Sequence, residues 1–136
     1  MAGQYTVPLG FLAISNPADS TTYYAGLSNT FAASSDTWAE GHYEIPVAGT
    51  IVAVSYFLKT ASVSATSEDS TLAIRVDDSS DIAAETFTWD VLAQSRTVTG
   101  LSQAVIAGTK IALKFTTPAW VTNPTSVSIS AVVYFQ

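Results

Sequence analysis

The clearest pattern in the chain is a strict alternation of apolar and polar residues over short segments, which is typical of half-buried β-strands. In segment 71–76 the apolar positions are Leu72, Ile74 and Val76. In segment 127–135 the polar face carries Ser128, Ser130 and Tyr134, and the apolar face carries Val127, Ile129, Ala131, Val133 and Phe135. Both segments are predicted to be strands with one face on the core.

Further strands are predicted between turn signals at Pro46, Gly49 and the polar run 77–81. They cover segments 38–45, 51–58, 84–92, 96–98 and 110–116. No segment has the pattern of a long helix. About eight short strands, spaced at about ten residues, predict an all-β fold, an antiparallel β-sandwich that resembles a jelly roll. A chain of 136 residues suits a single domain over 1–136, with the sandwich over 38–136.

The N-terminal segment 1–20 is interpreted separately, because Pro8 cannot donate a hydrogen bond to a β-ladder. It is expected to be either an edge strand or an arm that docks on a neighbouring subunit. The apolar residues that such an arm would bring to an interface are Val7, Leu9, Phe11, Leu12 and Ile14.

Segment 47–56 is echoed by segment 106–115, each with an Ala-Gly-Thr turn leading into a strand. Two equivalent units suit the two Greek keys of a jelly roll. Their second faces differ, since Ile51, Ala53 and Phe57 occupy this face in the first strand, whereas Lys110, Ala112 and Lys114 occupy it in the second. The outer side of the first strand is therefore expected to be covered by the arm or by another subunit, which adds Ile51 and Phe57 to the candidate interface.

Composition narrows the classes of function. The formal net charge is −6 with five scattered basic residues, which disfavours nucleic acid and anionic membranes as partners. The chain has no cysteine, which excludes disulfides and thiolate metal sites, and it has 17 Ser and 18 Thr. Neither a leader peptide nor a membrane-spanning run is recognisable, so synthesis in the cytosol is expected.

No catalytic, cofactor or metal site is predicted. His42 is the single histidine and no Gly-x-Ser-x-Gly elbow is present, so it is expected to be a solvated strand residue. The acids Asp77, Asp78 and Asp81, with Glu68 and Asp69, could offer oxygen ligands to calcium, but their spacing is not that of an EF-hand. Solvated turns commonly have this composition.

Aromatic residues leave two interpretations open. They could form a platform on which sugar rings stack, or they could be buried as large aromatics usually are. The candidates for glycan or partner contact are Tyr23, Tyr24, Trp38 and Trp120. On the alternative interpretation, Phe87 and Trp89 belong to the core and Trp120 anchors the loop 117–125.

Segments 45–51, 68–76, 107–109 and 117–125 together resemble small β-domains of virion proteins from tailed bacteriophages. The resemblance covers about two-thirds of the chain, and its most specific part is the run from Pro118-Ala119-Trp120 to Asn123-Pro124-Thr125. Related sequences often have Asp in place of Thr109, and Asn in the turn occupied by Asp77 and Asp78. The resemblance implies non-enzymatic, jelly-roll-like sandwiches that assemble as trimers on capsid surfaces or at fibre ends.

The expected function is therefore that of a capsid decoration, or cement, protein on the virion surface, with no enzymatic activity and no cofactor. Its expected partners are copies of itself, as a homotrimer, and the major capsid protein or another virion protein. The alternative is a tail-fibre or receptor-binding module that holds host surface glycan. An enzyme and a free-standing carbohydrate-binding module are weaker alternatives, since the chain has neither a catalytic constellation nor a linker.

Overall fold

Regular structure in this protein consists of β-strands packed as two antiparallel sheets. The computed structural model describes residues 4–26, 42–63 and 68–136, without the side chains of 11–13. Within that part of the chain, no helix is long and apolar enough to cross a membrane. The strands are β1 (Tyr5–Ile14), β2 (Thr22–Ala25), β3 (Tyr43–Glu44), β4 (Gly49–Lys59), β5 (Ser70–Val76), β6 (Ser80–Phe87), β7 (Ala93–Val105), β8 (Lys110–Thr116) and β9 (Val127–Phe135).

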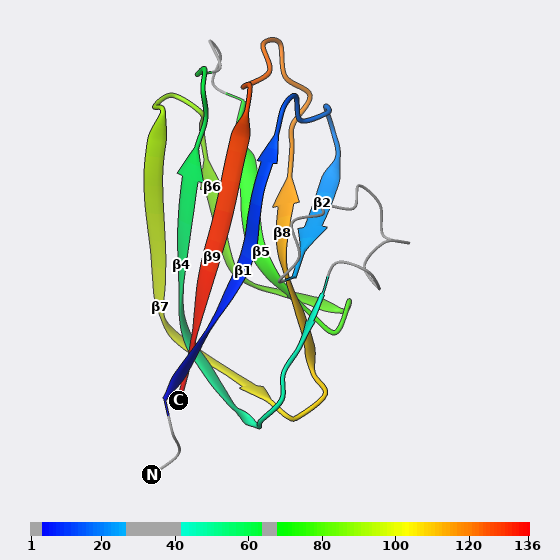
Figure 1. Cartoon of the computed structure of the whole chain (residues 1–136), viewed down its shortest axis with the longest axis vertical. Coiled ribbons are helices and arrows are strands. Elements are labelled where there is room, and N and C mark those ends of the chain that lie inside the picture. The colour runs from blue at the N-terminus through cyan, green and yellow to red at the C-terminus, as the bar shows by residue number, and fades with distance from the viewer. Residues whose placement is uncertain (1–3, 27–41, 64–67) are drawn as a thin grey trace.

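The strand order is that of a jelly roll, which confirms the predicted fold class. Sheet A has the order β1-β9-β4-β7, and sheet B has the order β2-β8-β5-β6, with the short β3 also paired to β8 (Figure 1). The halves β1-β2-β4-β5 and β6-β7-β8-β9 are two Greek keys folded together. The echoed segments of the sequence are β4 and β8, the third strand of each half and an inner strand of each sheet.

The core lies between the two sheets, where the apolar rows of the strands face one another. Phe87, Trp89 and Phe115 form an aromatic cluster there, with the rings of Phe87 and Trp89 edge to face at 5.1 Å between centroids. The indole nitrogen of Trp89 donates a hydrogen bond to the Ser70 hydroxyl at 3.2 Å. The core assignment of Phe87 and Trp89 is therefore confirmed.

The N-terminal segment is an edge strand of its own domain rather than an arm. β1 pairs with β9 from Tyr5 opposite Phe135 to Ile14 opposite Val127. Its inward side chains Val7 and Leu9 are 4% and 1% exposed and belong to the core. Their burial removes them from the candidate interface.

A bulge in β1 ties this edge strand to sheet B. The register with β9 shifts between Leu9 and Leu12, and Gly10 lies there with φ of +63°. The Gly10 amide donates to the Gly26 carbonyl at 2.7 Å, and a Cβ at Gly10 would lie 2.9 Å from the side chain of Leu113. Glycine is required because the conformation is left-handed and the approach is close.

A second bulge corrects the predicted faces of β4. Val52 has no counterpart in β9, because Ile51 pairs with Phe135 and Ala53 with the adjacent Tyr134. On the other side, the register with β7 shifts at the same point. The alternation therefore changes phase, so Ile51 faces the core and is fully buried instead of sharing the outer face with Ala53 and Phe57.

The boundaries of two predicted strands also need correction. The segments 84–92 and 96–98 correspond to β6 (Ser80–Phe87) and β7 (Ala93–Val105). The length of β7 was underestimated because β7 is an edge strand with a weak apolar pattern, and most of its side chains are partly or fully exposed. Of the predicted strand 38–45, the described part contains only β3. The polar run 77–81 contains the predicted turn, in which Asp77 and Asp78 adopt the left-handed backbone conformation that is common in turns.

One hydrogen bond crosses the core between the sheets. The hydroxyl of Tyr56, which is fully buried on β4, donates to the carbonyl of Ala83 on β6 at 2.8 Å. Ala83 has φ of +53°, close to the shift in register between β5 and β6. Burial raises the pKa of the Tyr56 hydroxyl, and the charges of Glu85 and Asp81 raise it further, so this group is a neutral donor.

We predict that Tyr56→Phe lowers the free energy of unfolding by about 1–3 kcal/mol, because it leaves the Ala83 carbonyl buried without its donor. Urea denaturation of the purified protein measures this change. Tyr134→Phe is the matched control, since Tyr134 is 37% exposed and its loss of a hydroxyl is expected to change stability by less than about 0.5 kcal/mol. Equal effects of the two substitutions would contradict the role of the crossing bond.

Candidate functional site

The outer face of sheet A is the candidate functional surface, and it consists of four rows of side chains that run across the strands. These side chains are the residues that alternate with the core positions of β1, β9, β4 and β7. In register, the rows are Thr6, Tyr134, Ala53 and Thr99; Pro8, Val132, Ser55 and Thr97; Ser130, Phe57 and Ser95; and Ser128, Lys59 and Ala93.

This face is nearly free of charge, since Lys59 is the one ionisable cation in the four rows. Two aromatic rings stand exposed on it, Phe57 at 48% and Tyr134 at 37%. Some of the hydroxyls pair with each other, as the Ser55 and Thr97 oxygens do at 3.2 Å. A partner covering this face would therefore displace little water bound to charged groups.

Two hollows lie at opposite ends of the face. The Tyr134 hollow has a volume of about 440 Å³ and is lined by Tyr5, Thr6, Val52, Ala53 and Tyr134. The Phe57 hollow has a volume of about 430 Å³ and is lined by Phe57, Lys59, Gln94, Ser95, Ser128 and Ser130. The first is mainly apolar, and the second combines a ring, a cation and hydroxyls.

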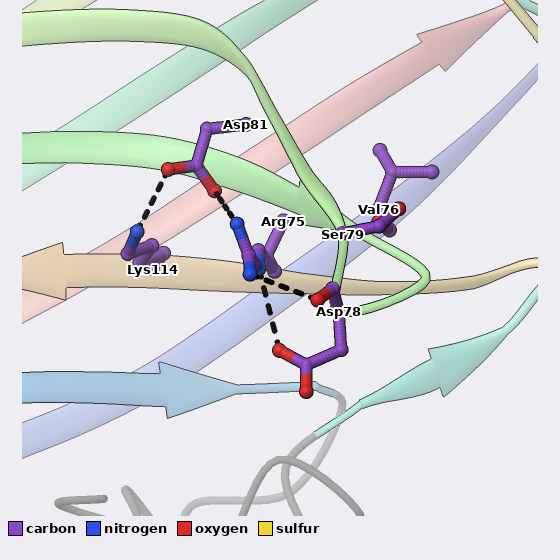
Figure 2. A network of polar contacts seen from close by, with 6 residues as sticks. All are labelled: Arg75, Val76, Asp78, Ser79, Asp81 and Lys114. Carbon is purple, nitrogen blue, oxygen red and sulfur yellow. Dashed lines mark hydrogen bonds and ion pairs between the residues drawn. The ribbon is translucent and has the colours of Figure 1, made fainter. Parts of the chain in front are cut away.

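The outer face of sheet B has the opposite character, because it carries a network of paired charges (Figure 2). Arg75 contacts Asp81 at 3.1 Å and Asp78 at 3.3 Å, and Lys114 contacts the other oxygen of Asp81 at 2.7 Å. The Arg75 guanidinium also donates to the Asp78 backbone carbonyl at 2.8 Å. These contacts join β5, β6, β8 and the β5–β6 turn.

The network sets the protonation of Asp81. Partial burial raises the pKa of its carboxyl, but hydrogen bonds and charge attraction from Lys114 and Arg75 outweigh burial, and the net pKa is lowered. Asp81 therefore stays ionised to more acidic pH than an ordinary aspartate. Its two oxygens are both occupied by cations of the protein itself.

The acids considered as calcium ligands do not converge. Glu68 and Asp69 precede β5, and Asp77, Asp78 and Asp81 follow its other end. One oxygen of Glu68 accepts a hydrogen bond from the Val121 amide at 3.2 Å, and Asp77 accepts one from the Lys110 amide at 2.8 Å. Among residues 4–26, 42–63 and 68–136, no three His, Cys, Asp or Glu residues form a metal-binding group.

The predicted glycan contacts are corrected by burial. Tyr23, Tyr24 and Trp120 are 8%, 5% and 6% exposed, so their rings are not available as a platform. Tyr23 stacks on Phe115, and its hydroxyl accepts a hydrogen bond from the Ala18 amide at 2.8 Å. Trp38 lies outside the described residues.

The remaining interface candidates divide between the two sides of sheet A. Ile51 is buried with Val7 and Leu9, whereas Phe57 is exposed, and Ile14 is partly buried against the core. Phe11 and Leu12 belong to β1, but their side chains lie outside the description. Val52 and Val132 were not predicted to be surface residues, although the alternation in 127–135 placed Tyr134 on the outer face.

Comparison with known proteins gives no family assignment. No family model matches the sequence, and no curated protein matches it. One solved structure that is similar in fold is the crystal structure of FLHE, which aligns with a TM-score of 0.45 and 15% sequence identity over 99% of each chain. Identity and structural agreement at this level carry no functional inference.

We predict that Asp81→Asn lowers the free energy of unfolding by roughly 1 kcal/mol at pH 7, a modest value because the network is partly exposed. Since the pKa of Asp81 is lowered in the folded state, its contribution is present above the unfolded pKa of about 4 and is lost as pH falls through the folded pKa. Wild type should therefore lose more stability than the variant between about pH 5 and pH 2.

Chemical denaturation across this pH range checks the prediction. Asp90→Asn is the matched control, because Asp90 is exposed and outside the network. If the free energies of unfolding of wild type and Asp81→Asn changed in parallel with pH, the result would contradict the lowered pKa of Asp81.

Proposed function

We propose that this protein is a non-enzymatic structural component of a bacteriophage virion, a capsid decoration protein that forms a homotrimer and binds the outer shell. The charge-poor outer face of sheet A carries the proposal. The resemblance of segments 45–51, 68–76, 107–109 and 117–125 to phage virion domains supports the same assignment, and a jelly roll is a rigid unit suited to such a role.

Electrostatics explains why that face would join copies of the chain. Each copy has a net charge of −6, so copies repel one another at close range unless the contact itself is free of acidic residues. The rows through Tyr134 and Val132 meet this requirement, since their members are Thr, Pro, Tyr, Val, Ala and Ser. The proposed subunit contact is centred on the Tyr134 hollow and includes Val52 and Ala53.

A second apolar site, at one end of the sandwich, is the proposed contact with the major capsid protein. Val47 and Ile106 are equivalent in the two echoed segments, and they are 60% and 72% exposed. Two backbone hydrogen bonds hold their turns together, from Ile45 to the Thr109 carbonyl at 2.7 Å and from Gly108 to the Ile45 carbonyl at 2.8 Å. Both turns lie at the end of the sandwich where β1 begins and β9 ends (Figure 1).

The second candidate function is a tail-fibre or receptor-binding module that holds host surface glycan. The Phe57 hollow favours it, because an exposed ring beside several hydroxyls has the chemistry of a sugar site. Counting copies in purified particles separates the two candidates: hundreds of copies on the shell agree with decoration, and a few copies at the tail agree with the receptor role.

We predict that Tyr134→Asp converts the trimer into monomers, because three added carboxylates would face a contact that has no cations to pair with them. Native mass spectrometry and sedimentation measure the assembly state. Val121→Asp is the matched control, since Val121 is 80% exposed on the loop before β9, at the opposite end of that strand from Tyr134. A trimer that survives Tyr134→Asp, or a monomeric wild type, would overturn the proposed subunit contact.

We also predict that Val47→Asp combined with Ile106→Asp leaves the trimer intact but lowers its affinity for undecorated particles by at least about tenfold, which corresponds to 1.4 kcal/mol. Both side chains are exposed, so the variant is expected to fold normally. Co-sedimentation with particles measures binding. Unchanged binding would exclude this end of the sandwich as the contact with the shell.

A further inference from the structure

The Phe57 hollow has an arrangement that the proposed assembly role does not explain. Phe57 is 48% exposed, and its direct cross-strand neighbours are Ser130 on β9 and Ser95 on β7. Directly opposite residues have Cβ atoms about 5 Å apart, so the ring has a hydroxyl on each side. An apolar surface flanked by hydroxyls matches a sugar ring, whose C–H face is apolar and whose rim is hydroxylated.

Lys59 gives the hollow a positive charge at a defined distance from the ring. It lies two residues beyond Phe57 on the same face of β4, which is about 7 Å along the strand, and Ser128 lies opposite it. No carboxylate of the described residues pairs with Lys59, whereas Arg75 and Lys114 on sheet B are both in ion pairs. Lys59 is therefore free to bind an anion.

The side chain of Gln94 is not counted as part of the site, because Gln94 lies opposite the buried Leu58 on the core-facing side of β7 and its amide nitrogen donates to the Thr88 carbonyl at 2.8 Å. The volume of about 430 Å³ lies within the range of about 300–1,000 Å³ typical of small-molecule sites. The hollow thus contains a stacking surface, hydroxyls that donate and accept, and a cation.

We propose that the Phe57 hollow binds an acidic saccharide: a sugar ring that stacks on Phe57 and bears a carboxylate that pairs with Lys59. Ser95, Ser130 and Ser128 hydrogen-bond the ring hydroxyls. The proposal does not depend on the decoration role, because the hollow lies at the opposite end of the face from Tyr134. The proposal adds a ligand class to the proposed function, namely a surface polysaccharide built of uronic acids.

Titration of the full chain with trigalacturonate tests the site, with the trimethyl ester of the same trisaccharide as the uncharged comparison. Amide resonances followed by NMR locate binding and report the fold of each variant. The expected result is that the acid perturbs residues of the Phe57 hollow and binds more tightly than the ester. Raising the salt concentration should remove much of this difference, since the pair is exposed to solvent.

Two variants separate the roles of charge and ring. Lys59→Gln should weaken trigalacturonate about fivefold and leave the ester unchanged, and Lys59→Arg should retain binding. Phe57→Ala should weaken both ligands about fivefold, since the ring contact is common to them. Lys110→Gln, which removes an exposed cation from β8 of sheet B, should leave both affinities unchanged.

Three results would overturn the site: no perturbation by either trisaccharide, equal affinity for acid and ester, or perturbations that map away from the Phe57 hollow. Failure here leaves the assembly results for Tyr134→Asp unaffected, and loss of the trimer contact leaves saccharide binding by the monomer measurable. The two proposals can therefore fail separately.

Discussion

The whole structure depends on two sheets sharing one layer of apolar side chains. The inner strands of both sheets commit many of their residues to that layer, and Tyr56 crosses it with a hydrogen bond to the Ala83 carbonyl of the opposite sheet. The inner faces supply the apolar burial that stabilises the fold, so folding does not fix the residue types on the two outer faces. Their composition can therefore be set by what the protein contacts.

The two outer faces use this freedom differently. On sheet B, Arg75, Asp78, Asp81 and Lys114 neutralise one another through close ion pairs. Covering that face would remove a paired network from water, which is costly unless the partner replaces its solvent contacts. On sheet A the rows through Tyr134 and Val132 have no charge to desolvate. The asymmetry of the faces, more than any single residue, is the reason for proposing sheet A as the contact surface.

Strand alternation made much of the fold predictable. The bounds of β8 and β9 were predicted correctly, because each has an uninterrupted apolar row and a polar or charged opposite face. The echo between 47–56 and 106–115 indicated two Greek keys, and its two copies are corresponding strands of the jelly roll. The length of edge strand β7 was underestimated, since an edge strand needs no continuous apolar row. The residues of β7 are mostly Ser, Thr, Gln and Ala.

What alternation alone could not supply was the phase of each strand around a bulge. Gly100 has φ of +74° within β7, and an isolated glycine in a strand is a sign of a bulge that sequence reasoning could have used. The displaced register on β4 had no comparable signal, because Val52 is an ordinary strand residue. A prediction that ignores this shift in register therefore places Ile51 on the outer face of sheet A, together with Phe57.

Local sequence also left the candidate aromatics open between an exposed platform and burial. Tyr23, Tyr24 and Trp120 are large rings next to loops or strand ends, where local sequence does not indicate what will cover them, and the fold buries all three. Phe57 is exposed because Tyr56 and Leu58, its neighbours on β4, are both committed to the core. Near the start of β4, the bulge at Val52 lets Ile51 rejoin the core while Val52 and Ala53 both line the Tyr134 hollow. A single inserted residue thus concentrates apolar surface at one end of sheet A and leaves the ring and the cation at the other.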